Sequence, residues 1–211
     1  MALSFPLRQQ AAAFASLLGF AFFACVLPAL AQDAPVRLRG TIESVDGRLL
    51  MIKLRDGASV KVRLAEKARI SALVKASLAD VAPGTFVGIT SMPSDKGGQK
   101  ALEIHIFPEA MRGTGEGQRA WDIAPQTTMT NGNIDLRVAA VAGEDLTLSF
   151  KGGTAKIEVP PETTIVAFAE SRPDDLKPGN KAILFGLKTG DDGILEAAAI
   201  AIGRDGLTPP M

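Results

Sequence analysis

The sequence predicts an all-β protein that consists of two tandem, small antiparallel OB-like β-barrels, each with a short helical turn. After residue 35, apolar residues recur at every second position, which is the period that places side chains on one face of a strand. Turn signals rich in Gly and Asp separate these runs, and the whole pattern occurs twice. Short, closely spaced strands with one helical interruption are typical of a closed or partly closed barrel, although an open sandwich has the same signature.

Residues 1–31 are expected to be a cleaved signal peptide. Arg8 supplies a positive start, residues 11–27 are apolar, and Pro28-Ala29-Leu30-Ala31 matches the small-x-small pattern before a cleavage site. The alternatives are an uncleaved membrane anchor and a lipoprotein acylated at Cys25; the Pro and Ala residues of the cleavage pattern favour cleavage. We therefore expect a periplasmic protein that meets the membrane only through this segment.

The composition excludes several classes of function. Removal of residues 1–31 takes away Arg8 and no acidic residue, so 22 of the 23 basic residues remain against 23 acidic ones. Near-neutrality gives no electrostatic reason to expect nucleic acid or an anionic membrane as a partner. The single Cys leaves with the same segment, which excludes a disulfide and thiol chemistry in the mature chain.

The first copy of the pattern covers residues 36–107, and each of its elements has a recognisable signal. Alternating apolar residues mark the strands, and Gly-containing dipeptides mark the turns. In order, we expect a hairpin around Asp46-Gly47, a turn at Arg55-Asp56-Gly57, a strand through Val60, Val62 and Leu64, a short strand around residues 70–74, one helical turn capped by Ser77 and ending before Pro83-Gly84, and a last hairpin made by residues 86–91 and 100–107.

The second copy covers residues 133–203 and is followed by a C-terminal tail, residues 204–211. The segment from Gly40 to Leu54 aligns with the segment from Leu136 to Phe150. Asp80 to Gly84 aligns with Asp175 to Gly179 at a constant spacing of 95 residues, so we expect Asp80 and Asp175 to be structural. Because a domain of about 70 residues is marginal alone, the two copies are expected to pack together.

A connector between the copies, residues 108–132, has no counterpart in the repeat. Long ordered loops are often functional, and this one contains the only Trp. The candidate residues for binding a ligand or partner are Arg112, Glu116, Arg119, Trp121 and Asp122. The alternatives are that the arginines pair with neighbouring carboxylates and that Trp121 plugs the interface between the two domains. Residues 113–117 superficially resemble a phosphate loop but lack its GK[ST] ending.

The connector also carries a resemblance to a known family. The stretch from Glu103 to Gly117, with Arg119, Trp121, Asp122 and the run from Met129 to Gly132, resembles the signature of a family of exported bacterial proteins with tandem small β-barrel domains and no established activity. The resemblance covers essentially the whole mature chain and implies a periplasmic address. In similar sequences we expect His where Gln118 stands, so this chain lacks an imidazole there.

A metal site is the alternative to a binding surface without cofactors. His105 is the only His, and Glu103 and His105 are expected on the strand face opposite the core. With Glu109 or Asp122 folded back, they would form a mixed nitrogen and oxygen site for a divalent metal. The competing interpretation is an exposed strand pair, or an imidazole that is hydrogen-bonded to the connector.

No catalytic constellation is readable in the sequence. There is no Ser nucleophile elbow and no metalloprotease motif, and the pairs Asp174-Asp175 and Asp191-Asp192 fall in predicted turns. We therefore expect a non-enzymatic periplasmic binding or scaffold protein for an envelope protein or a small ligand. The alternative is an accessory metal-binding protein linked to envelope metal handling.

Overall fold

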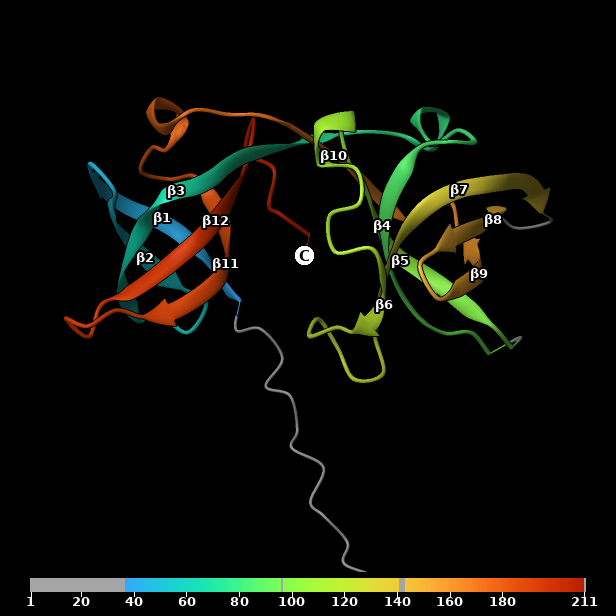
Figure 1. Cartoon of the computed structure of the whole chain (residues 1–211), viewed down its shortest axis with the longest axis horizontal. Helices are drawn as coiled ribbons and strands as arrows, with labels where there is room; N and C mark the ends of the chain where they lie inside the picture. Colours follow the sequence, from blue (N-terminus) through green and yellow to red (C-terminus); the bar gives the residue numbers. More distant parts are fainter. Residues whose placement is uncertain (1–36, 96, 141–142, 211) are drawn as a thin grey trace, which may run out of the picture. The chain divides into compact units, whose positions relative to one another are not determined.

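The computed structural model describes residues 37–95, 97–140 and 143–210 (Figure 1). The predicted signal peptide, residues 1–31, lies outside the described residues. Within the described ranges the regular elements are β-strands and three short 3-10 turns, which confirms the all-β prediction. None of the described segments is a helix of the length and apolarity needed to span a membrane.

Five strands close into a small mixed barrel. They are β1 (Leu38–Asp46), β2 (Leu49–Leu54), β3 (Ser59–Lys75), β11 (Lys181–Thr189) and β12 (Leu195–Gly203). Antiparallel pairs join β3 to β2, β2 to β1, β1 to β11 and β11 to β12, and a parallel pair between β12 and β3 completes the circuit. Alternate side chains fill the interior, including Ile42, Leu50, Ile52, Leu184 and Ile200, all of which are buried.

The barrel takes its strands from both ends of the chain, which differs from the expectation that residues 36–107 close a barrel by themselves. Its first three strands belong to the first copy and its last two to the second. The physical reason lies in β3. Instead of ending near Leu64 and restarting around residue 70, the chain continues as one 17-residue strand with an irregularity in its pairing to β12. The length of β3 carries the chain away from β1 and β2 before the next hairpin begins.

The hairpin that ends the first copy pairs elsewhere. It consists of β4 (Phe86–Pro93) and β5 (Gln99–Ile106), and β4 pairs with β7 (Thr128–Ala140). The order continues through β8 (Gly143–Phe150) to β9 (Gly153–Val159), which also forms a short parallel pair with β5. These strands enclose a second buried cluster that includes Val87, Ile89, Ile104, Ile134, Leu146 and Leu148.

A further strand, β10 (Thr164–Glu170), joins the two groups of strands. It pairs antiparallel with β3 and parallel with β5. The connector adds a 3-10 turn at Glu109–Met111 and the strand β6 (Gly117–Ala120), which pairs with the start of β7. The connector is therefore held against β7 by main-chain hydrogen bonds.

Equivalent main-chain hydrogen bonds relate the two copies in a register that differs from the sequence alignment by four residues. The carbonyl of Ile42 accepts a hydrogen bond from the N–H of Gly179 at 2.8 Å, and the carbonyl of Ile134 accepts one from Gly84 at 2.7 Å. Because Gly84 and Gly179 are equivalent, Ile42 corresponds to Ile134 and not to Val138. An even shift preserves which residues face inward, so the alternating pattern alone does not reveal it.

The helical turns confirm the prediction for the two matched Asp residues. Leu78–Asp80 and Pro173–Asp175 are 3-10 turns at equivalent places. The Asp80 carboxylate accepts hydrogen bonds from the N–H and hydroxyl of Ser77 at 2.8 and 2.9 Å. The Asp175 carboxylate accepts from the N–H of Arg172 and the hydroxyl of Ser171 at 2.9 and 3.0 Å. Both carboxylates hold the start of their turn and are structural.

Candidate functional site

A cleft of about 320 Å³ lies where the connector faces strands β3, β5, β10, β11 and β12. Its wall combines aromatic and aliphatic side chains with a few polar groups, which is the usual composition of a small-molecule site. The residues that line it are Arg37, Arg69, Ser71, His105, Phe107, Met111, Thr114, Gly115, Arg119, Trp121, Met129, Asn131, Phe168, Phe185, Gly186, Ala199 and Ile200.

Buried polar side chains from neighbouring strands lie together at the His105 side of the cleft. The Thr90 hydroxyl donates a hydrogen bond to Glu103 Oε1 at 2.8 Å, and His105 Nε2 lies 3.8 Å from the same oxygen. Glu103 is 3% exposed and His105 is 1% exposed. The competing interpretation of an exposed strand pair is therefore wrong. The face opposite the core is covered too, and the Phe168 ring lies 6.1 Å from the imidazole.

Burial decides the charge of both groups. It raises the pKa of Glu103 to about 7, against the opposing effect of the Thr90 hydrogen bond. It lowers the pKa of His105 to about 3, so the imidazole is neutral at neutral pH. The 3.8 Å contact between Glu103 and His105 is consequently not a pair of opposite full charges.

The other side of the cleft is built around Trp121. The guanidinium carbon of Arg37 lies 3.5 Å from the centre of the indole ring, and that of Arg119 lies 5.2 Å from it. Asp122 binds Arg37 at 3.2 Å and Arg39 at 2.8 Å, which ties the connector to the start of β1. Burial alone would raise the pKa of Asp122, but the two guanidinium groups lower it.

Several polar atoms of the cleft are buried without a hydrogen-bond partner among the described residues. They are Arg37 Nη1, His105 Nε2, Trp121 Nε1 and Asn131 Oδ1, and only Thr163 Oγ1 shares this property elsewhere in that part of the chain. Arg37 Nη1 lies within ion-pair distance of Asp122 but outside hydrogen-bonding geometry. Buried polar atoms are almost always paired, so this concentration in one cleft calls for a partner.

Aromatic rings form the apolar part of the wall. Phe107 and Phe168 are stacked, with ring centres 4.9 Å apart and planes at 24°. Phe185, Met111 and Ile200 extend the apolar surface. Phe107 follows β5 and Phe168 lies on β10, so the stack is positioned by the parallel pair between these strands.

Three of the five predicted binding residues, Arg112, Glu116 and Asp122, lie outside the cleft lining. Arg112 donates to Glu109 at 2.7 Å and to the Gly84 carbonyl at 3.0 Å, and it also contacts Asn133. Glu116 accepts a hydrogen bond from the Lys151 N–H at 3.0 Å. Both residues fasten the connector to neighbouring strands and turns. Of the predicted set, Arg119 and Trp121 line the cleft, and Asp122 holds Arg37 beside it.

The predicted metal ligands are not brought together. Glu103 and His105 are neighbours, but Glu109 is exposed and bound to Arg112. Across the described residues, no group of three or more His, Cys, Asp or Glu side chains is arranged to hold a metal ion.

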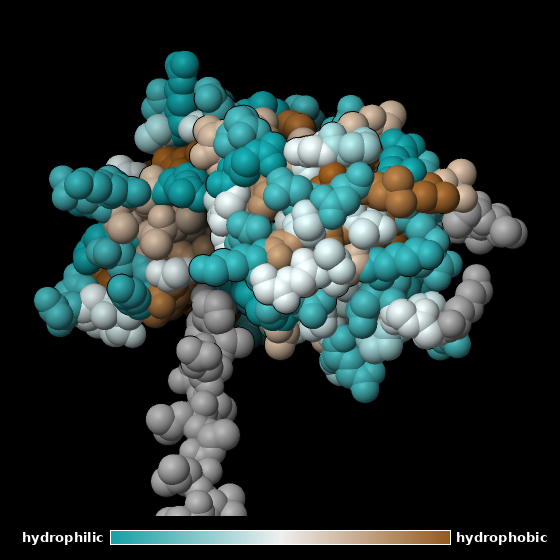
Figure 2. All heavy atoms as spheres, turned by 45° about the vertical axis from the view of Figure 1, so that its right-hand side comes forward, coloured by the Kyte–Doolittle hydropathy of each residue, from teal (hydrophilic) through white to brown (hydrophobic). Residues whose placement is uncertain are grey.

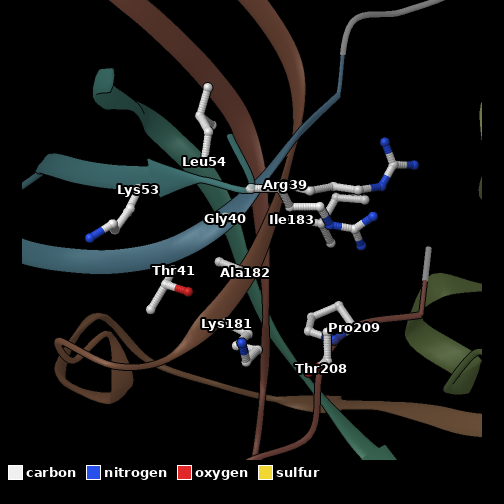
Figure 3. Close-up of a pocket in the computed structure, with 11 residues that line it drawn as sticks. Arg39, Gly40, Thr41, Lys53, Leu54, Lys181, Ala182, Ile183, Thr208 and Pro209 are labelled. Atoms are coloured by element: carbon white, nitrogen blue, oxygen red, sulfur yellow. The ribbon is translucent and has the colours of Figure 1, made fainter. Parts of the chain in front are cut away.

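A smaller pocket of about 160 Å³ lies beside β1 and β11 (Figure 3). Its basic residues are Arg39, Lys53, Arg55 and Lys181, and the C-terminal residues Thr208 and Pro209 complete the wall. Lys53, Arg55 and Lys181 are exposed, and no buried unpaired polar atom among the described residues lines this pocket. The cleft around Trp121 is therefore the stronger candidate.

The repeat contained a signal that the sequence interpretation missed. The strand pairing makes Thr90, Glu103 and His105 equivalent to Phe185, Ala199 and Ala201. The second copy thus builds the same strand pair with apolar side chains only. A comparison of the two copies position by position would have marked Glu103 and His105 as residues that the fold does not require.

Comparison of the chain with models of known families, with curated proteins and with solved structures finds no match.

Proposed function

We propose that this protein is a non-enzymatic periplasmic binding protein that holds a small molecule in the cleft around Trp121. The observation that carries the proposal is the set of four buried, unpaired polar atoms whose residues line that one cleft. Leaving a buried polar atom unpaired costs about 1–3 kcal/mol, so a bound molecule that pairs with them gains affinity and specificity.

The difference between the two copies supports a functional origin for these groups. The fold is built with Phe185, Ala199 and Ala201 in one copy, so stability gives no reason to bury Glu103 and His105 in the other. Burying ionisable groups is unfavourable without strong pairing. Their presence at the cleft is the pattern that a binding site produces.

The low pKa of His105 supports binding without catalysis. A general base is most effective when its pKa lies near the working pH, and burial lowers the pKa of His105 to about 3. The hydroxyl of Ser71, which also lines the cleft, donates to the Ile200 carbonyl at 3.4 Å. Neither group is arranged as an activated nucleophile and its base.

A surface role as a scaffold has less support. Most of the face shown in Figure 2 is hydrophilic, with apolar areas that are small and separate. The large exposed hydrophobic residues of the described chain are Met92, Ile123, Leu136 and Val138. Leu136 and Val138 share one face of β7, but two side chains are far smaller than the continuous patch that marks a docking surface.

The architecture that we propose is a pair of OB-like barrels that exchange their last hairpins. The circuit formed by β4, β5, β9, β8 and β7 repeats the circuit of the five-stranded barrel. The pair between Gln99 and Ile157 is equivalent to the pair between Leu195 and Val62. On this interpretation the cleft belongs to the place where the two copies meet.

Titration with the neutral fluorescent probe N-phenyl-1-naphthylamine tests the proposed cleft. We expect saturable fluorescence enhancement with the protein and its loss in Ala199→Phe, because Ala199 lines the cleft. The matched control is Ala198→Phe, where the same ring is added at an exposed position outside the lining. Equal binding by both variants, or no saturable binding by the unmodified protein, contradicts the proposal.

A further inference from the structure

The charged side chains that line the cleft are all of one sign. Three arginines line it, Arg37, Arg69 and Arg119, and no Asp or Glu does. Asp122 balances Arg37, but none of the carboxylates in the described part of the chain pairs with Arg69 or Arg119. Arg119 instead donates to the Gly115 carbonyl at 2.6 Å. The cleft therefore carries uncompensated positive charge.

Arg119 is held in this position in spite of an electrostatic cost. Burial, followed by the nearby charge of Arg37, lowers the pKa of Arg119. Two guanidinium groups thus approach the same indole ring, and only Arg37 has a carboxylate beside it. An anion placed near Arg119 would remove this imbalance.

The unpaired atom on this side is a donor. The buried indole N–H of Trp121 has no acceptor among the described residues. A donor of this kind matches an oxygen of a carboxylate, sulfate or phosphate group. The opposite part of the wall is apolar, with the stacked rings of Phe107 and Phe168.

We propose that the cleft binds an anionic amphiphile, whose acidic head group lies between Arg119 and the indole N–H of Trp121 and whose apolar body lies against Phe107, Phe168 and Phe185. This inference rests on the proposed function and adds the chemical class of the ligand. It follows from the uncompensated arginines, the unpaired donor and the aromatic wall.

Displacement of N-phenyl-1-naphthylamine by molecules with one ten-carbon tail and different head groups tests the inference. Decanoate, decyl sulfate and decyl phosphate provide three anions, decanol a neutral head and decylamine a cation, all used below their aggregation limits. We expect each anion to displace the probe at least about tenfold more tightly than decanol, and decylamine more weakly than decanol. The order among the anions identifies the preferred acid.

Arg119→Gln is the decisive variant. It should reduce the affinity for decanoate at least about tenfold and change the affinity for decanol less than about twofold. The matched control is Arg112→Gln, another connector arginine, whose guanidinium binds Glu109 and the Gly84 carbonyl away from the cleft lining. Far-ultraviolet circular dichroism establishes that both variants are folded.

The outcomes separate the two proposals. If decanol competes as well as the anions, or if Arg119→Gln weakens both equally, the head-group assignment is overturned while the binding cleft stands. If the probe itself fails to bind the unmodified protein, the proposed function is overturned as well.

Discussion

Leu73 on β3 and Phe168 on β10 face one another in an antiparallel strand pair, and they stand at equivalent places in the two copies, 95 residues apart. The same offset of 95 residues exchanges the two flanking pairs, since Lys75 corresponds to Glu170 and Ser71 to Val166. The main chain is therefore symmetric about this point, but the side chains are not. Phe168 reaches the cleft and stacks on Phe107, whereas Leu73 is buried with Ile183 and Ala201.

The buried carboxyl group of Glu103 makes stability depend on pH. Its pKa is about 7 in the folded protein and 4.5 ordinarily, so the folded state holds a proton that the unfolded state releases between these values. Stability attributable to this group is therefore greatest at low pH and falls as the pH rises through this interval. Glu103→Gln keeps an acceptor for Thr90. Its advantage over the unmodified protein in the free energy of unfolding should increase by roughly 2 kcal/mol from pH 5 to pH 8.

Chemical denaturation of both proteins at pH 5 and pH 8 measures this difference. Glu116→Gln is the control, because it makes the same chemical change at an exposed position. A Glu103→Gln protein whose advantage is the same at both pH values would show that the carboxyl group titrates normally in the folded state.

Asp122 fastens the connector to β1, and its loss should be measurable. Asp122→Ala leaves Arg37 and Arg39 without their shared carboxylate. Because the Asp122 side chain is 34% exposed, we expect a loss of only about 1 kcal/mol, smaller at high salt. The emission of Trp121, the only Trp of the chain, should shift as the connector loosens.

The matched control for this variant is Glu162→Ala, which breaks an exposed pair with Lys100 outside the connector. It should change neither the Trp emission nor the stability by more than a few tenths of a kcal/mol. An equal effect of both substitutions would mean that Asp122 is an ordinary surface residue.

Two equivalent glycines allow close strand packing. A Cβ atom on Gly40 would collide with the Lys53 carbonyl, and one on Gly132 would collide with the Ser149 carbonyl. Gly40→Ala and Gly132→Ala should each destabilise the protein by about 2–3 kcal/mol, since backbone must move. Gly153→Ala is the control, because its Cβ would meet only the Phe150 ring at 3.8 Å. Thermal unfolding of the three variants decides between these expectations.

The pairing of β1 with β11 and of β3 with β12 predicts that a fragment of residues 33–107 does not fold. Without β11 and β12, the apolar interior side chains of β1 to β3, such as Ile42 and Ile52, lose their cover. The amide proton signals of the fragment should be poorly dispersed, whereas those of residues 33–211 should be well dispersed. A dispersed spectrum from the fragment would mean that the first copy closes on its own hairpin.

The sequence was sufficient to predict the local elements. Alternation identified the strands, Asp46-Gly47 identified a hairpin, and the matched pair of Asp80 and Asp175 identified the two capped turns. These features depend on interactions between residues that are close in the chain, so their signals are local.

Strand partners could not be predicted in the same way. A strand with alternating apolar residues can pair equally well with either copy of the last hairpin, because both hairpins present an apolar face. For the same reason, the sequence alignment matches Ile42 with Val138 instead of Ile134, since both positions lie on the same strand face. Alternation predicts that Glu103 and His105 share the face opposite the core, but not that this face is buried, because Phe168, which packs beside His105, lies far along the sequence.

The pairing of β1 with β11 sets the order in which the molecule can assemble. Leu38 lies opposite Leu184 in the strand pair, so the first described strand to be synthesised finds its partner in one of the last. Closing so long a loop carries an entropic cost, and topologies dominated by distant contacts form slowly. The N-terminal strands consequently have no native neighbour on one side until translation is nearly complete, and maturation of the barrel follows synthesis rather than accompanying it.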